Sequence, residues 1–238
     1  MRALGMPDDL GRILVWAGLA ALGVGVSRRL GARRTRRASA SSGSARSPVG
    51  FEKQLEDLAA CGIRLAPGVS PEALLISSDR EAFRSDPYRL LLCIMGGEAE
   101  DETQAGETGH PSDDIWHFDT ECIEDTGAYA AIARRMSTLA RGDLPLEEIT
   151  DHVDVDGKEA SLSFRLSGQP HRWEARVEND WVDPAILSRF AGLLASRHAA
   201  RRFTYIDLDG QDCLIGCATD GERARLERVT GLSVSWLT

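Results

Sequence analysis

The sequence predicts an α+β protein: a mostly antiparallel sheet of about five to six strands with helices on one face, preceded by a helical N-terminal anchor and a disordered linker. Several short runs alternate apolar and polar residues, as half-buried strands do. Asp-Gly turns lie between such runs and favour hairpins over parallel crossovers. Stripes of apolar residues at helical spacing lie between the strand-like runs. The chain is 42% hydrophobic and 27% charged, which is typical of a globular protein and excludes a fully disordered one.

Residues 1–37 have the pattern of a membrane anchor with a basic flank. Residues 13–26 form a run of fourteen residues without charge, followed by six arginines between Arg28 and Arg37. A bilayer core needs about 17 to 25 apolar residues, so this run is near the lower limit. The positive-inside rule places the rest of the chain in the cytoplasm. We therefore expect a single-pass membrane protein with a cytoplasmic C-terminal domain, or a cytoplasmic protein if the leader is not translated.

Residues 38–50 are small, polar and turn-prone, which predicts a flexible linker. The globular domain is then expected to span residues 51–238. Its first part is predicted to be helical, because it contains an apolar stripe and a capping residue before both Pro71 and Pro87. These signals predict helices over residues 51–60, 71–76 and 88–95, followed by an acidic loop over residues 98–113.

The rest of the domain is predicted to alternate strands and helices. Residues 115–122 place Trp116 and Phe118 on one side and polar residues on the other, which predicts a strand with one packed face. Asp-Gly dipeptides favour hairpin turns, and Thr219-x-x-Glu222 is a capping box. The other predicted strands cover residues 149–156, 159–166, 171–177, 202–207 and 213–218, and the other helices cover residues 126–140, a segment after Asp183-Pro184, and a segment from Thr219 to Gly231.

The charge of the chain is divided unevenly. Residues 1–50 hold nine arginines and two aspartates, and the other 188 residues carry a net charge of −16. An acidic surface repels phosphates, which argues against direct nucleic-acid binding by the domain. The same surface attracts basic proteins and speeds their association. The sequence contains no Walker A, dinucleotide-binding or G-x-S-x-G motif, so we expect no cofactor and no enzymatic activity.

These observations favour a non-enzymatic, cytoplasm-facing interaction protein, comparable to an immunity or inhibitor protein, whose acidic domain binds a basic protein partner. An aromatic residue surrounded by acids suits the centre of such an interface. The predicted partner-binding residues are Asp119, Glu121, Glu124, Asp125 and Trp181. In the alternative interpretation the four acids have a structural role, because they lead into a predicted helix whose positive end they would complement.

A metal-dependent hydrolase is the alternative function. One predicted strand carries His117, Asp119 and Glu121 on a single side, and another carries His152, Asp154 and Asp156. If the two strands are neighbours, imidazoles and carboxylates could hold a divalent metal and a reactive water. The candidate ligands are His117, Asp119, His152 and Asp154. Otherwise both faces are simply the solvent sides of half-buried strands. A third possibility is a scaffold or sensor tethered to the membrane through residues 13–26.

Overall fold

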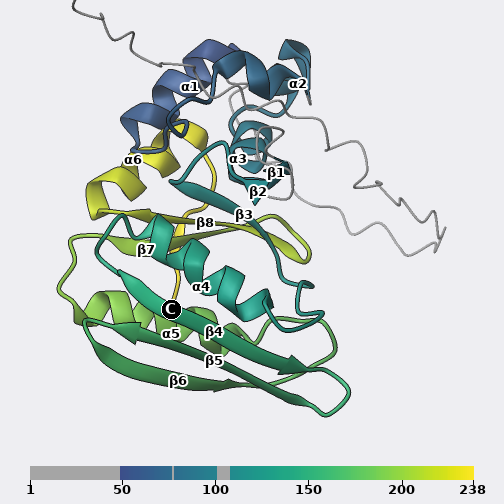
Figure 1. The fold of residues 1–238 in the computed structure, drawn as a ribbon. Coiled ribbons are helices and arrows are strands. Elements are labelled where there is room, and N and C mark those ends of the chain that lie inside the picture. The colour runs from purple at the N-terminus through teal and green to yellow at the C-terminus, as the bar shows by residue number, and fades with distance from the viewer. Residues whose placement is uncertain (1–48, 77, 101–107) are drawn as a thin grey trace, which may run out of the picture.

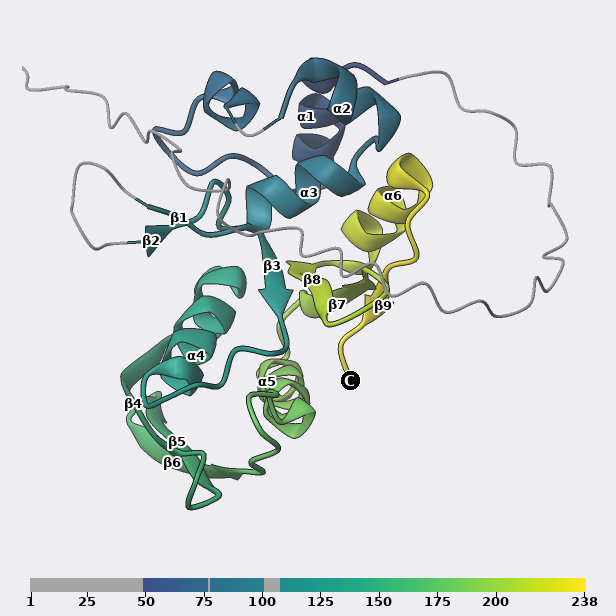
Figure 2. The same ribbon diagram turned by 90° about the vertical axis from the view of Figure 1, so that its right-hand side faces the viewer.

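The computed structural model describes residues 49–76, 78–100 and 108–238, and its main elements are stacked as alternating layers of helices and sheets (Figures 1 and 2). The outer helical layer covers one face of a four-stranded antiparallel sheet, and two further helices lie between that sheet and a three-stranded one. The outer layer contains α1 (Phe51–Ala60), α2 (Arg80–Ser85), α3 (Arg89–Gly96), α6 (Asp220–Thr230) and the short 3-10 helix Pro71–Leu75, and the inner pair is α4 (Ala128–Leu139) and α5 (Pro184–Ser196).

Both main sheets are antiparallel throughout. The four-stranded sheet has the order β3-β8-β7-β9, and the three-stranded sheet has the order β4-β5-β6. The bounds are β3 (Ile115–Asp119), β8 (Asp212–Ala218), β7 (Arg202–Asp207) and β9 (Ser235–Trp236), and β4 (Leu146–Asp154), β5 (Glu159–Leu166) and β6 (Gln169–Ala175). Two short strands, β1 (Ala99–Glu100) and β2 (Thr108–Gly109), pair within the segment predicted to be an acidic loop.

The α+β class and the antiparallel pairing are confirmed, but the strands divide between two sheets instead of forming one. The division arises because β3 pairs with β8, a strand far along the chain, while β4 starts a separate meander with β5 and β6. The four-stranded sheet also has helices on both faces, whereas the sequence predicted helices on one face.

Alternating residues of the four-stranded sheet enter two different cores. In β3, Trp116 and Phe118 point toward α4 and α5, and Ile115 points toward α1 and α3. In β8, Ile215 joins the first of these cores and Leu214 joins the second. This is the two-residue period of a strand, applied to a sheet that is buried on both faces.

Several predicted boundaries are confirmed. Thr219 and Glu222 form the capping box of α6, and Gly231 ends the helix with a φ of 74°. Asp183 caps α5 with proline in the first turn. The sequence prediction missed α2, which Asp79 caps, and the C-terminal strand β9.

The predicted anchor, residues 1–37, and nearly all of the predicted linker lie outside the described residues. Within the described ranges, no helix combines the length and the apolar character needed to cross a membrane.

Candidate functional site

The predicted acidic string and Trp181 lie side by side, although they are far apart in the sequence. The segment after β3 runs antiparallel to the segment before α5, and Glu121 and Trp181 form a β-bridge. The Ile123 amide donates to the Asp180 carbonyl at 2.8 Å, and the Val182 amide donates to the Thr120 carbonyl at 2.8 Å. We use the name Trp181 face for the surface formed by Asp119, Glu121, Glu124, Asp125, Glu178, Asp180 and Trp181.

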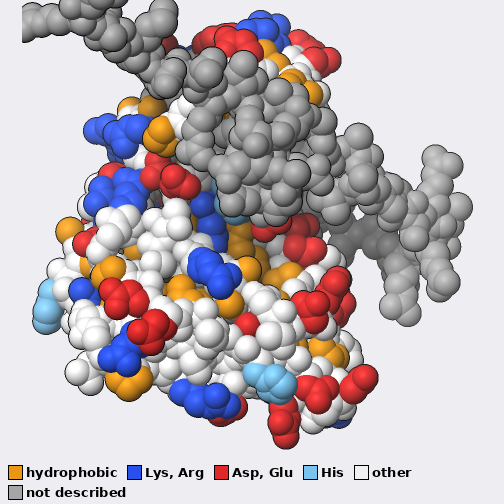
Figure 3. All heavy atoms as spheres, viewed as in Figure 1, with side chains coloured by type: hydrophobic (Ala, Val, Ile, Leu, Met, Phe, Trp, Pro, Cys, Tyr) orange, Lys and Arg blue, Asp and Glu red, His pale blue; other side chains and the backbone are white. Residues whose placement is uncertain are grey.

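The Trp181 face is exposed and acidic. Trp181 is 41% exposed, one of two large hydrophobic residues that stand out in this way in the described part of the chain. The acids around it are exposed, except Glu121, which is half-buried. Figure 3 shows Asp and Glu side chains gathered along the right-hand side of the molecule, the side on which α4 begins and the β7–β8 hairpin ends in Figure 1. The face therefore presents an aromatic ring within a field of negative charge.

Hydrogen bonds from the surrounding elements hold both segments of the face. The carboxylate of Asp119 accepts from the amide of Glu121 and from the side chain of Gln211 in the β7–β8 hairpin. Asp183 is buried, and its carboxylate accepts from the Arg176 and Ala185 amides, while its own amide donates to the Tyr129 hydroxyl at 3.1 Å. The face is thus anchored to the β7–β8 hairpin, to α4 and to the start of α5.

Cys122 lies close enough to several of these acids for them to influence its thiol. Burial raises the pKa of its thiol to about 12, and the carboxylates of Asp119, Glu98, Asp180 and Glu124 add to the rise. These acids come from three separate segments and all act on one side chain. The thiol therefore stays protonated at neutral pH, which disfavours a nucleophilic role.

The carboxylate that bonds the first amides of α4 comes from Asp151 and not from the acidic string. The carboxylate of Asp151, on β4, accepts from the amides of Gly127, Tyr129 and Ala130 at 2.9–3.3 Å. A carboxylate at this position satisfies the first amides of the helix and complements its dipole. Glu124 and Asp125 therefore remain exposed on the Trp181 face. No local signal identified Asp151, because it belongs to another element.

The residues proposed as metal ligands are not brought together. His117 lies on β3, which pairs with β8, and His152 lies on β4, which pairs with β5 in the other sheet. His117 Nε2 is 3.5 Å from Asp212 Oδ1, and His152 is exposed with Asp154 on β4. Among the described residues, no group of three or more histidines, cysteines and acids has the geometry to hold a metal. The condition on which the metal site depended, β3 beside β4, is therefore not met.

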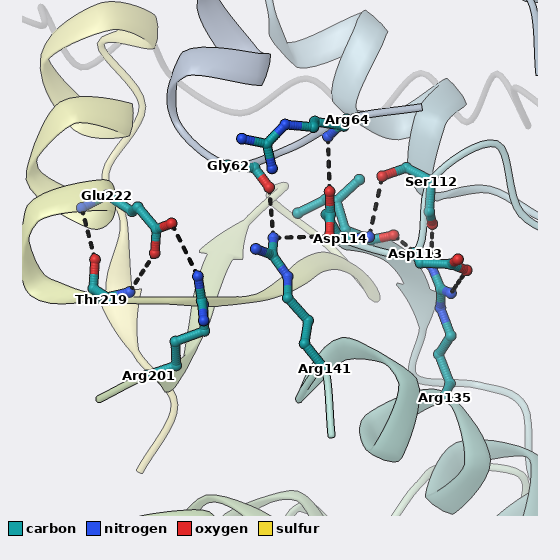
Figure 4. Close-up of polar contacts among 11 residues, drawn as sticks. Gly62, Arg64, Ser112, Asp113, Asp114, Arg135, Arg141, Arg201, Thr219 and Glu222 are labelled. Carbon is teal, nitrogen blue, oxygen red and sulfur yellow. Dashed lines mark hydrogen bonds and ion pairs between the residues drawn. The ribbon is translucent and has the colours of Figure 1, made fainter. Parts of the chain in front are cut away.

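A second polar cluster joins the outer helical layer to the rest of the molecule (Figure 4). Arg135 of α4 donates to the carbonyls of Ser112 and Ile115, and Arg141, just after α4, donates to the carbonyl of Gly62 and forms a 2.8 Å ion pair with Asp114. Burial lowers the pKa of Arg135 to about 10, so the guanidinium is still charged at neutral pH.

A third arginine of this cluster, Arg201, lies 3.3 Å from Glu222, the residue that completes the capping box of α6. All three guanidinium groups point toward carbonyls or carboxylates of the chain itself (Figure 4). We conclude that this cluster is structural. The sequence did not reveal it, because the partners, backbone carbonyls and carboxylates alike, lie in distant segments.

Comparisons with known proteins give one informative match. No family model and no solved structure matches the chain. Disk-determining factor A of Haloferax volcanii is 33% identical to it over 66 residues, which are 100% of that protein and 28% of this chain. The chain belongs to the family of Disk-determining factor A. The match leaves most of the chain without a counterpart in Disk-determining factor A, and it assigns no role to any residue of the Trp181 face.

Proposed function

We propose that the chain is a non-enzymatic interaction protein whose Trp181 face binds a basic protein partner. One observation carries the proposal: two segments far apart in the sequence meet through the Glu121–Trp181 bridge and present an exposed indole among carboxylates. The name of Disk-determining factor A specifies no partner, so the proposal rests on this geometry and charge.

The chemistry of the face fits an arginine or lysine side chain. An indole attracts a cation placed over its ring, and this attraction grows when the contact is shielded from water. Carboxylates around the ring would pair with the same cation or with its neighbours, and they would also speed the encounter. Because hydrogen bonds to Gln211 and Tyr129 already order the two segments, little conformational entropy would be lost on binding.

The test captures partners from a native extract and compares variants that carry the same change in charge. The face variant carries Glu124→Gln, Asp125→Asn and Asp180→Asn, and a second variant carries Trp181→Ala. The control carries Glu147→Gln, Asp156→Asn and Glu159→Gln, which are exposed residues on and between β4 and β5. We expect a basic protein that binds the natural chain and the control, is released by salt, and binds Trp181→Ala roughly 10- to 100-fold more weakly.

The affinities of the captured protein would be measured by titration with each purified full-length variant. Equal binding by the face variant and the control would mean that net charge is sufficient and that the Trp181 face has no special role. A captured protein that is acidic, or binding that is insensitive to salt, would also contradict the proposal.

A further inference from the structure

Three of the four edges of the two main sheets are very short or carry a side-chain bond to the strand backbone, and the fourth carries one such bond, from Arg189. At the edge of β3, Arg135 donates to the carbonyl of Ile115. The edge strand β9 has only two residues. At the edge of β4, the hydroxyl of Thr126 bonds both the amide and the carbonyl of Val153. The fourth edge, β6, is seven residues long and pairs in regular register with β5, and no other described strand pairs with it.

The backbone pattern identifies which groups of β6 face outward. Opposite residues of an antiparallel pair alternate between those that exchange hydrogen bonds and those that do not. Val153 turns its backbone toward Thr126, so Val153 and Ala160 are a pair that does not exchange hydrogen bonds. The next pair, His152 and Ser161, therefore does exchange them, and the backbone of Ser161 bonds β4. Glu174, which lies opposite Ser161 in β6, then turns its backbone away from the sheet. In agreement, Arg189 of α5 donates to the Glu174 carbonyl at 2.9 Å.

Arg172, two residues before Glu174, faces outward in the same way, so its amide and carbonyl lie along the open edge. Pro170 also lies at this edge, where a residue without an amide hydrogen is tolerated. On one face of the strand the side chains of Arg172 and Glu174 are exposed and 3.0 Å apart. On the other face Trp173 is half-buried against Phe164 and Phe190.

We propose that a second copy of this chain adds its β6 antiparallel to this edge, which joins two three-stranded sheets into one of six strands. The charges select the register. With a twofold axis at Trp173, Arg172 of each copy lies opposite Glu174 of the other. A shift of the register by two residues places the Arg172 side chains of the two copies opposite each other, or the two Glu174 side chains. Repulsion between like charges disfavours both of these registers. In both views β6 lies at the rim of the molecule, so its free edge faces away from the other layers (Figures 1 and 2).

This arrangement uses groups that the isolated chain leaves at its surface. The two Trp173 side chains would face each other across a non-bonded pair, where side chains approach most closely. Arg189 must release the Glu174 carbonyl, which its exposed side chain can do by changing rotamer. The interface is self-complementary, as a twofold contact requires. It is also separate from the Trp181 face.

Sedimentation velocity of the full chain, run in one detergent throughout, tests the proposal. We expect a dimer that Arg172→Glu or Glu174→Arg weakens roughly tenfold or more, since either change places like charges opposite each other in two symmetric pairs. The double variant R172E/E174R restores the opposite charges and should dimerise again. An equal mixture of the two single variants should form a heterodimer, because the acidic edge of one then meets the basic edge of the other.

The control is Arg134→Glu, which makes the same change of charge as Arg172→Glu but at an exposed position on α4. It should dimerise as the natural chain does, and circular dichroism should show that all variants are folded. A natural chain that stays monomeric at its highest soluble concentration would overturn the proposal. So would self-association that both single reversals leave intact, as expected if residues 13–26 hold the copies together, or a mixture that forms no heterodimer.

Discussion

Single polar side chains connect elements that are distant in the sequence, and this is where sequence-based prediction failed at the residue scale. The capping box of α6 was predicted because Thr219 and Glu222 are three residues apart. The cap of α4 was not, because Asp151 follows Gly127 by 24 positions. The string of acids before α4 seemed able to serve the helix end, and only the folded arrangement shows that Asp151 does so.

At residue 151, we predict that Asp151→Ala lowers the free energy of unfolding by about 1–2 kcal/mol, because the amide of the N-cap residue Gly127 and two amides in the first turn of α4 lose their acceptor. Urea unfolding followed by circular dichroism measures the change. Asp156→Ala removes an exposed carboxylate from the β4–β5 turn and should change stability by less than about 0.5 kcal/mol. If both variants lose the same stability, loss of net charge, and not loss of the cap, would be the cause.

At the scale of elements, the close approach of α3 to β3 depends on one glycine. A Cβ built on Gly96 would lie 2.5 Å from the backbone nitrogen of His117 and 2.8 Å from the carbonyl carbon of Trp116. Both neighbours are backbone atoms in a buried sheet, so they cannot move aside as a flexible side chain would. The end of α3 therefore rests directly on the strand that leads to the Trp181 face.

We predict that Gly96→Ala destabilises the chain by about 2 kcal/mol or more, because α3 must be pushed away from β3. The matched variant is Gly192→Ala, in the middle of α5, where the added methyl meets no atom within 4 Å. There alanine should stabilise the helix by about 0.5–1 kcal/mol. Thermal unfolding of both variants measures the difference, and a shift of the same sign in both would contradict this explanation.

Strand positions were predicted better than strand partners. Alternation and Asp-Gly turns located β3 to β8 to within a few residues, because these signals are local. The pairing of β3 with β8 joins residues about one hundred positions apart, and nothing in either strand specifies that partner. The proposed metal site needed β3 beside β4 and failed for this reason. Asp119, Glu121, Glu124, Asp125 and Trp181 could be singled out from the sequence because acids and tryptophan are conspicuous by type. That Glu178 and Asp180 join them on one surface depends on the long-range contact between the two segments.

At the scale of the whole molecule, the four-stranded sheet belongs to two cores at once. Leu214 and Ile215, adjacent in β8, are fully buried in different cores. Loss of either core would expose one face of this sheet to water. We therefore expect the described layers to unfold as one cooperative unit.

We predict that Leu58→Ala, a change in the outer core only, lowers the free energy of unfolding by about 2–5 kcal/mol. Circular dichroism measures the loss of secondary structure in the whole fold. Tryptophan fluorescence also senses Trp173, which packs against the core that does not contain Leu58. Both signals should shift to lower urea concentration by the same amount. Two separate transitions in the variant, with fluorescence unchanged in the first, would show that the cores are independent.

The short strand β9 has a practical consequence for anyone who shortens or extends this chain. Trp236 lies opposite Thr204, and the amide of the next residue, Leu237, donates to the Phe203 carbonyl at 2.9 Å. The guanidinium carbon of Arg202 lies 3.8 Å from the centre of the Trp236 ring. Removing β9 would leave β7 as an exposed edge strand with unpaired backbone groups, which favours aggregation. Variants and fusions of this chain should therefore keep β9 intact.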